Sequence, residues 1–246
     1  MKILVCISKV PDTTSAVQFT DNNTKFKSDG VTFIINPADE WYALVRALEL
    51  KEANGAHVTL INVGGAENEQ ILRKAISIGG DDCVRIDAEP QNSFFVASQI
   101  ANYAKSNGFD LVFCGKETID YNGFEVPGMI AEFMDYTYVS LVSKMQMEGN
   151  TATFERDIEG GIEVVSAELP LVISASKGIA EQRIPNMKGI MAARTKPMQV
   201  IAPIECENTM HVIQYENAPA KKGVKMLQAD QMDELVKLLH EEAKVI

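Results

Sequence analysis

The chain has 246 residues, of which 46% are hydrophobic and 23% charged, a balance that is ordinary for a globular protein and sufficient for one large α/β domain. Its net charge of −11 argues against nucleic acids and anionic membranes as partners, because both carry negative charge themselves. No apolar run approaches the ~20 residues of a membrane-spanning helix, so we expect no membrane insertion.

The four cysteines, Cys6, Cys83, Cys114 and Cys206, are far apart in the sequence and form no CxxC pair. The histidines are equally scattered, so we expect no metal site. The first apolar stretch is too short for a signal peptide. These features predict free thiols in a reducing compartment and a cytoplasmic location.

The first half of the chain alternates between two patterns. Buried strands are expected where apolar residues follow one another, at residues 3–7, 58–63, 84–86 and 111–114. Helices are expected where apolar residues recur at helical spacing, at residues 37–52, 67–78, 93–106 and 127–134. Short apolar strands that alternate with helices indicate a doubly wound, mostly parallel, Rossmann-like sheet covered on both faces.

The pattern changes from about Tyr138 onwards. Polar and apolar residues alternate at 145–147, 151–154 and 162–165, as in antiparallel strands, and Glu159-Gly160-Gly161 is suited to a tight turn. Residues 171–174 can rejoin the main sheet. The predicted fold is therefore an α/β sheet with an antiparallel extension.

The last part of the chain, from residue 178, shows few clear periods until a final helix at residues 230–243. A long segment without its own core either wraps a partner or lies over its own domain, and the residues alone leave both open. Within it, Met187, Met191 and Met198 lie among several cations. This stretch is either a solvated loop or an adaptable docking loop.

Four polar or glycine-bearing loops follow the expected strands, at residues 8–12, 36–39, 63–66 and 115–128. The carboxyl ends of parallel strands meet at one edge of a doubly wound sheet, where ligands bind. Each loop alone is compatible with an ordinary turn, but the four together favour a nucleotide site. No catalytic motif is present, so we expect no enzyme activity of the chain's own.

Nearly the whole chain resembles the beta subunit of the electron-transfer flavoproteins. The stretches that carry the resemblance occur in the family's order, at residues 5–12, 35–37, 115–120, 157–161 and 189–194. The resemblance implies a heterodimer with an alpha subunit that holds most of one FAD near the interface. It also implies electron transfer from flavoprotein dehydrogenases, such as acyl-CoA dehydrogenases, towards the quinone pool through the electron-transfer flavoprotein quinone oxidoreductase.

The resemblance further implies that the beta subunit binds AMP in a domain formed by residues 1–177. By position, the AMP site comprises Cys6, Asn36, Pro37, Ala38, Asp39, Val63, Gly115, Lys116, Glu117, Thr118, Ile119, Asp120, Tyr121, Asn122, Gly123, Phe124, Glu125 and Val126. Residues 178–246 would form a recognition loop and an arm that wraps the alpha subunit. The residues implied in docking a dehydrogenase are Arg183, Met187, Lys188, Ile190, Met191 and Arg194.

The chain departs from the family's usual phosphate loop at two positions. Phe124 is bulky and has no side-chain donor, and Glu125 is an anion where a neutral amide is usual. The loop would therefore bind AMP through backbone N–H groups only, bind another nucleotide, or bind none. Two alternatives stay open: an electron-bifurcating relative with a second FAD in this subunit, and a non-redox adenine-nucleotide-binding module.

Overall fold

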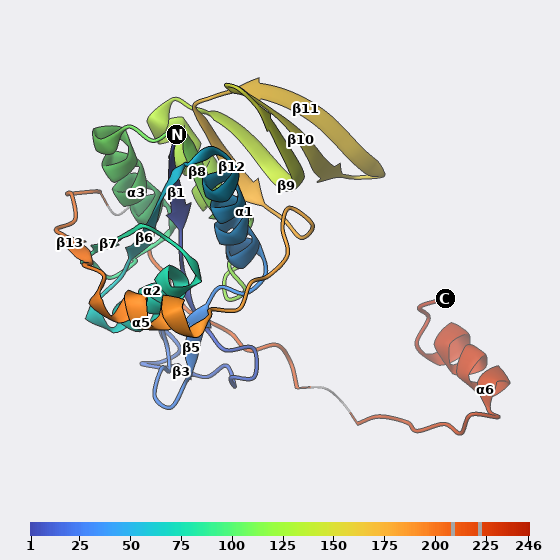
Figure 1. Cartoon of the computed structure of the whole chain (residues 1–246). Coiled ribbons are helices and arrows are strands. Elements are labelled where there is room, and N and C mark those ends of the chain that lie inside the picture. The colour runs from blue at the N-terminus through green and yellow to red at the C-terminus, as the bar shows by residue number, and fades with distance from the viewer. Residues whose placement is uncertain (208–209, 221–222) are drawn as a thin grey trace. The chain divides into compact units, whose positions relative to one another are not determined.

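A computed structural model describes residues 1–207, 210–220 and 223–246. The chain forms two compact units, one made of Met1–Ala16 with Lys27–Ile213 and the other of Val17–Phe26 with Gln214–Ile246. The larger unit is a sheet with helices on both of its faces (Figure 1).

The main sheet has nine strands in the order β11-β10-β9-β12-β8-β1-β6-β7-β13. Their bounds are β1 Lys2–Cys6, β6 His57–Val63, β7 Asp82–Ile86, β8 Leu111–Gly115, β9 Thr137–Glu148, β10 Thr151–Ile158, β11 Gly161–Glu168, β12 Leu171–Ala175 and β13 Gln199–Ile201. The pairs from β9 through β13 along the sheet are parallel, whereas β10 is antiparallel to both of its neighbours. The predicted fold class is confirmed.

The helices of the larger unit are α1 Asp39–Asn54, α2 Glu69–Ile78, α3 Ser93–Asn107, α4 Val126–Met134 and α5 Met187–Thr195, with a 3₁₀ turn, η1 Ala66–Asn68, before α2. Alternate residues of β1 enter two separate cores. Ile3 and Val5 pack with α1 and α2, whereas Leu4 and Cys6 pack with α3 and α4. Burial on both faces explains why this strand is apolar throughout, as parallel strands generally are.

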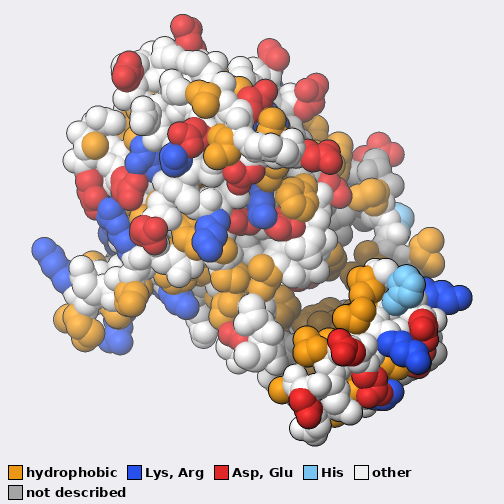
Figure 2. Space-filling view, turned by 90° about the vertical axis from the view of Figure 1, so that its right-hand side faces the viewer, with side chains coloured by type: hydrophobic (Ala, Val, Ile, Leu, Met, Phe, Trp, Pro, Cys, Tyr) orange, Lys and Arg blue, Asp and Glu red, His pale blue; other side chains and the backbone are white. Residues whose placement is uncertain are grey.

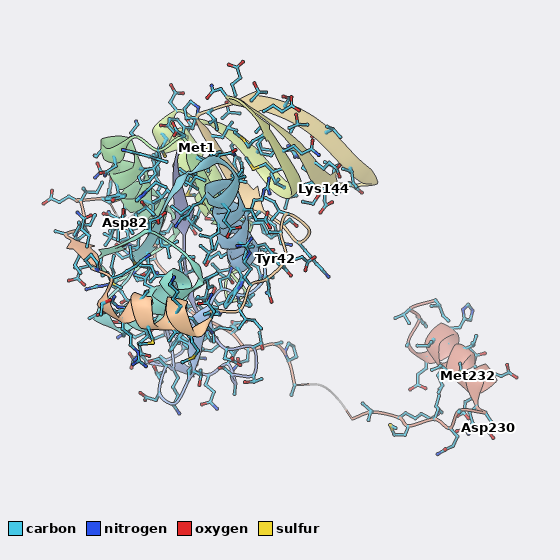
Figure 3. All side chains as sticks on the ribbon, in the orientation of Figure 1. Met1, Tyr42, Asp82, Lys144, Asp230 and Met232 are labelled. Carbon is cyan, nitrogen blue, oxygen red and sulfur yellow. The ribbon has the colours of Figure 1, made fainter. Side chains whose placement is uncertain are left out.

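The antiparallel extension consists of β9, β10 and β11 and projects beyond the helical layers (Figure 1). Ile158 pairs with Gly161, which leaves Glu159 and Gly160 in the turn, and Gly160 has a φ of 82°. Lys144 on β9 forms a 2.8 Å ion pair with Glu155 on β10 (Figure 3). The predicted turn and the return of β12 to the main sheet are both present.

A second, antiparallel strand pair accompanies the main sheet in the larger unit. It joins β2 Lys9–Pro11 to β5 Phe33–Ile35. Because β2 follows β1 closely and β5 leads into α1, this pair brings the loop after β1 close to the start of α1. The site described below depends on that proximity.

Some boundaries differ from those predicted. The first helix begins at Asp39 rather than at Pro37, because Ala38 has a φ of 63° and a ψ of −100°, which no right-handed helix contains. The sequence also gave no clear signal for α5 or for β13. The final helix is shorter than predicted, since α6 covers Met232–Lys237 and a π-helical turn, η2, follows at Leu238–Glu242.

The smaller unit contains a short hairpin, β3 Phe19–Thr20 with β4 Lys25–Phe26, together with α6 and η2. Phe19 stacks on Tyr215 with ring centroids 4.9 Å apart, and the Tyr215 N–H donates to the Asn23 carbonyl at 2.7 Å. The helical segment around Met232 (Figure 3) displays hydrophobic side chains beside charged ones (Figure 2). It therefore has an apolar surface without a core of its own.

Neither long apolar helices nor ligand clusters for metals occur in the described ranges. No helix there has the length and apolar character needed to cross a membrane. The same residues contain no group of three or more His, Cys, Asp or Glu side chains arranged to hold a metal ion.

The fold predicts a large loss of stability on replacing Phe113 with Ala. Phe113 is fully buried on β8 in the core formed with α1 and α2, so its removal leaves a cavity at the centre of the sheet. We expect the free energy of unfolding to fall by about 3–5 kcal/mol in urea titrations. The matched variant Val164→Ala, at an exposed position of β11, should change it by no more than about 0.5 kcal/mol. Equal effects of the two changes would contradict this packing.

Candidate nucleotide site and docking helix

The order of the parallel strands reverses at β1. From β1 the chain continues to β6 and β7 on one side, and then crosses to β8 and β12 on the other side. In doubly wound sheets, ligands bind beyond the carboxyl ends of the strands at such a switch point. The candidate site therefore lies where β1 and β8 end, beside the N-terminus of α1.

The floor of this site is apolar and contains two thiols. The sulfur atoms of Cys6 on β1 and Cys114 on β8 are 3.5 Å apart, and both side chains are buried. The hydrogen bond with Cys114, together with burial, raises the pKa of the Cys6 thiol well above its usual value. Val63, at the end of β6, belongs to the same core cluster. The floor therefore carries no charge.

Asn36 fastens the loop after β8 to the segment before α1. Its side-chain amide donates to the Glu117 carbonyl at 2.9 Å, and its side-chain oxygen accepts from the Ile119 N–H at 3.0 Å. Asn36 is fully buried, so both hydrogen bonds are shielded from water. The predicted site residues from the two loops are thus brought together by one side chain.

Gly115 allows the closest approach in the site. A Cβ atom at this position would lie 2.8 Å from Cγ of Glu40 and 3.1 Å from both Cβ of Asp39 and the Glu40 backbone nitrogen. A larger residue would push β8 away from the start of α1. The close contact explains why glycine ends this strand.

Two buried carboxyl groups begin α1. Glu40 accepts the Ser8 N–H at 2.6 Å, but burial dominates and raises the pKa of Glu40 to about 8. Burial also raises the pKa of Asp39 to about 6, against the opposing influence of Lys116. Glu40 is therefore largely protonated at neutral pH. The start of α1 then carries less negative charge than two acidic residues would suggest.

The loop of residues 116–125 folds back on itself. Lys116 forms a 3.3 Å ion pair with Glu117, and its ammonium lies 5.8 Å from the centroid of the Phe124 ring. Asn122 returns to Glu117 through a 3.0 Å side-chain hydrogen bond. The ring of Tyr121 is 68% exposed and that of Phe124 is 49% exposed.

Helix α4 begins directly after this loop. Glu125 precedes it and makes no side-chain capping hydrogen bond. Helix geometry leaves the first N–H groups, among them those of Val126 and Gly128, without acceptors inside the helix. This N-terminus can receive an anion through backbone donors.

Sequence reasoning did not include Glu40 and Cys114 among the site residues, and it included Ser8 only as part of the loop of residues 8–12. Only the fold shows that the Ser8 N–H meets the Glu40 carboxyl group and that Cys114 meets Cys6. Lys9 and Asp12, both in the loop of residues 8–12, form no pair with each other. Lys9 pairs with Glu67 at 3.1 Å, while Asp12 accepts hydrogen bonds from Thr14.

The second candidate site is the outer face of α5. Met187 is 72% exposed and Met191 is 65% exposed, and Ile190 is also exposed beside the cations Lys188 and Arg194. Arg183 lies before the helix and is engaged with Glu52, so its guanidinium holds the segment in place. The sequence-predicted docking residues thus separate into an exposed group on α5 and one anchoring cation.

In a parallel α/β sheet with polar loops at its switch point, ligands generally bind at that edge. Residues 24–205 match the family model of the electron transfer flavoprotein domain. The chain is 34% identical to the electron transfer flavoprotein subunit beta of Bacillus subtilis, over 100% of both chains. It is 30% identical to that of Syntrophomonas wolfei, over 92% of this chain and 90% of the other, and 29% identical to the human one, over 92% of each.

The chain therefore belongs to the electron transfer flavoprotein family, and these relatives are its beta subunits. The resemblance drawn from the sequence motifs is confirmed. The family match, at residues 24–205, includes β5, the loop after β8 and helix α5, but not β1 or the loop that follows it.

The buried Glu40 predicts a pH-dependent stability. Because its pKa in the folded protein, about 8, exceeds the ordinary value of 4.5, the folded state keeps a proton that the unfolded chain has released. The contribution of Glu40 to the free energy of unfolding should therefore decrease as pH rises between these two values. We expect Glu40→Gln, which keeps an acceptor for Ser8, to gain stability relative to wild type from about pH 5 to about pH 9.

Urea titrations at several pH values measure this difference, with Glu132→Gln as the control because Glu132 is exposed on α4. A Glu40→Gln difference that does not vary with pH would contradict a protonated, buried Glu40.

Proposed function

We propose that this chain is the beta subunit of a heterodimeric electron-transfer flavoprotein that takes electrons from flavoprotein dehydrogenases, such as acyl-CoA dehydrogenases. The electrons then pass towards the quinone pool through the electron-transfer flavoprotein quinone oxidoreductase. The observation that carries the proposal is the 34% identity to a beta subunit along the entire length of both chains. The aligned length includes the candidate nucleotide site at the ends of β1 and β8, the antiparallel extension and the C-terminal arm.

In this proposal the chain is an electron carrier subunit and not an enzyme. An FAD held mainly by the alpha subunit, near the interface, supplies the electron-transfer chemistry when bound. The residues of this chain bind and orient, because moving electrons between flavins requires proximity and rapid docking rather than an acid–base pair. The neutral floor and the protonated Glu40 are consistent with a binding role.

The nucleotide edge of this subunit is proposed to hold AMP. The apolar floor formed by Cys6 and Val63 suits a base, and the N-terminus of α4 offers backbone N–H groups for a phosphate. Asn36 ties the loop after β8 to the segment before α1, and Gly115 lets the end of β8 approach α1 closely. The residues present therefore fit an adenine nucleotide, with Glu125 as the feature that opposes a phosphate most directly.

The exposed face of α5 is proposed to dock the dehydrogenase. A partner pocket that buries Met187 would gain about 1.5–3 kcal/mol, which is a substantial share of a weak and transient complex. Lys188 and Arg194 supply positive charge at the rim of this patch. A small anchor with charged surroundings allows fast association and fast release.

The remaining part of the chain is proposed to bind the alpha subunit. Residues 178–246 would combine the docking segment with an arm, and the arm's helix α6 exposes Met232 and Val236. An apolar helical face without a core of its own is suited to packing on a partner.

The four free cysteines are consistent with a reducing, cytoplasmic location.

Met187 predicts a selective defect in electron delivery. We expect Met187→Ala to raise the KM for the dehydrogenase about tenfold, since it removes a buried apolar side chain, and Met187→Glu to raise it further. The measurement is flavin reduction in the heterodimer by an acyl-CoA dehydrogenase with its substrate. Val17→Ala, which shortens an exposed apolar side chain in the other unit, should leave the rate unchanged.

Direct photochemical reduction of the flavin should be the same in all of these variants, because it needs no protein donor. Unchanged dehydrogenase-dependent rates in both Met187 variants would remove this residue from the docking role.

Glu125 predicts a nucleotide-retention effect. We expect Glu125→Gln to retain more AMP through purification than wild type, because the change removes a negative charge next to the N-terminus of α4. The measurement is AMP released on denaturation, per heterodimer. Glu132→Gln, at an exposed position of α4, serves as the charge-matched control. Equal AMP content in wild type and Glu125→Gln would contradict the repulsion.

A further inference from the structure

Helix α5 has only nine residues, and an isolated helix of this length is not stable in water. Its outer face is exposed, while Ala193 on the inner face is buried in the core that contains α2. The helix must therefore be held by contacts with the rest of the larger unit. Three such contacts are present, at its beginning, its middle and its end.

The segment before α5 is fixed to α1. The Arg183 guanidinium forms a two-pronged ion pair with Glu52, at 2.5 Å and 3.0 Å, and the Arg183 carbonyl accepts from Nε1 of Trp41 at 3.2 Å. Asn186 then caps the helix by accepting the Gly189 N–H at 2.8 Å. These contacts determine where α5 begins.

The middle of α5 touches the backbone of α2. A Cβ atom at Gly189 would lie 2.2 Å from the Ser77 carbonyl oxygen, so the two helices approach as closely as glycine permits. Ser77 itself is buried. This contact sets the distance between α5 and α2. It includes no hydrogen bond, so it does not fix the rotation of α5 about its own axis.

The end of α5 is held by Arg73 on α2, and the Lys196 ammonium, just after the helix, also donates to the Gly80 carbonyl. The Arg73 Nη1 atom donates to the Ala193 carbonyl at 2.7 Å and to the Lys196 carbonyl at 2.5 Å. Its Nε and Nη2 atoms donate to Glu69 at 3.3 Å and 2.9 Å, which orients the guanidinium. The last carbonyls of a helix lack hydrogen-bond donors and carry partial negative charge. A guanidinium at this end donates to these carbonyls and also carries the opposite charge.

We propose that Arg73 is a positioning residue for docking: by capping α5 it holds Met187 and Met191 outward in a fixed orientation. Helix α2 is a rigid support for it, because Ile71, Leu72, Ala75 and Ile76 are all buried in the core. The docking surface is thus preformed, and the partner does not have to order it on binding. This inference rests on the proposed docking role of α5.

The test uses Arg73→Met in the complete heterodimer, because methionine keeps an apolar stem but has no donors. Lys105→Met is the matched control, since Lys105 is an exposed cation on α3, away from α5. Arg73→Lys retains the positive charge but loses the planar guanidinium, whose Nε, Nη1 and Nη2 atoms make these hydrogen bonds. The first measurement is amide hydrogen exchange in α5, with the amides of β1 and β8 as the internal reference for global folding.

We expect exchange in α5 to accelerate at least about tenfold in Arg73→Met, with β1 and β8 unchanged, and by an intermediate factor in Arg73→Lys. Lys105→Met should match wild type. Unchanged exchange in α5 of Arg73→Met would overturn the positioning role of Arg73.

The second measurement is flavin reduction by an acyl-CoA dehydrogenase. We expect Arg73→Met to raise the KM for the dehydrogenase about tenfold at nearly constant kcat, because a disordered anchor weakens docking and not the electron transfer that follows. Faster exchange in α5 without any change in KM would overturn the link to docking and with it the proposed role of α5, while Arg73 would still cap the helix.

Discussion

The contact between the carboxyl end of β8 and the N-terminus of α1 is the constraint on which the rest of the structure depends. Gly115 has no room for a Cβ atom, because Glu40 and Asp39 lie directly against it. Burial of these carboxyl groups follows from this approach, and burial raises their pKa values. The close packing therefore determines both the shape and the charge of the candidate nucleotide site.

Helix α1 links the two candidate sites of the larger unit. Its first residues border the nucleotide edge, while Trp41 and Glu52 hold the segment that leads into α5. The same helix packs on the sheet through Leu44 and Leu48. One buried helix thus fixes both surfaces relative to one core, and neither has to be positioned by a long loop.

The sequence predicts the parallel sheet well, because burial on both faces requires unbroken apolar strands. It places the end of the first helix at residue 52, two residues before α1 ends at Asn54. It fails at Ala38, whose positive φ has no signal in the residue type. It also fails at α5 and β13, which are short and stabilised by contacts with distant residues such as Arg73 and, for β13, by pairing with β7. Periodicity cannot reveal elements that tertiary contacts maintain.

The predicted site residues illustrate the same limit. Loops at the ends of parallel strands are predictable, since topology places them at one edge. The partners of Asn36 on the far loop, and the meeting of Cys6 with Cys114, depend on which strands become neighbours. The sequence therefore identifies the edge but not the contacts within it.

Counting the bound cofactors shows whether this chain is the carrier subunit of a flavoprotein heterodimer. The complex containing this chain is purified from its native cells, denatured, and its released nucleotides are quantified by chromatography. We expect one FAD and one AMP per heterodimer. Two FADs would indicate the electron-bifurcating relative instead, and a chain that purifies with neither a partner subunit nor a flavin would contradict the account.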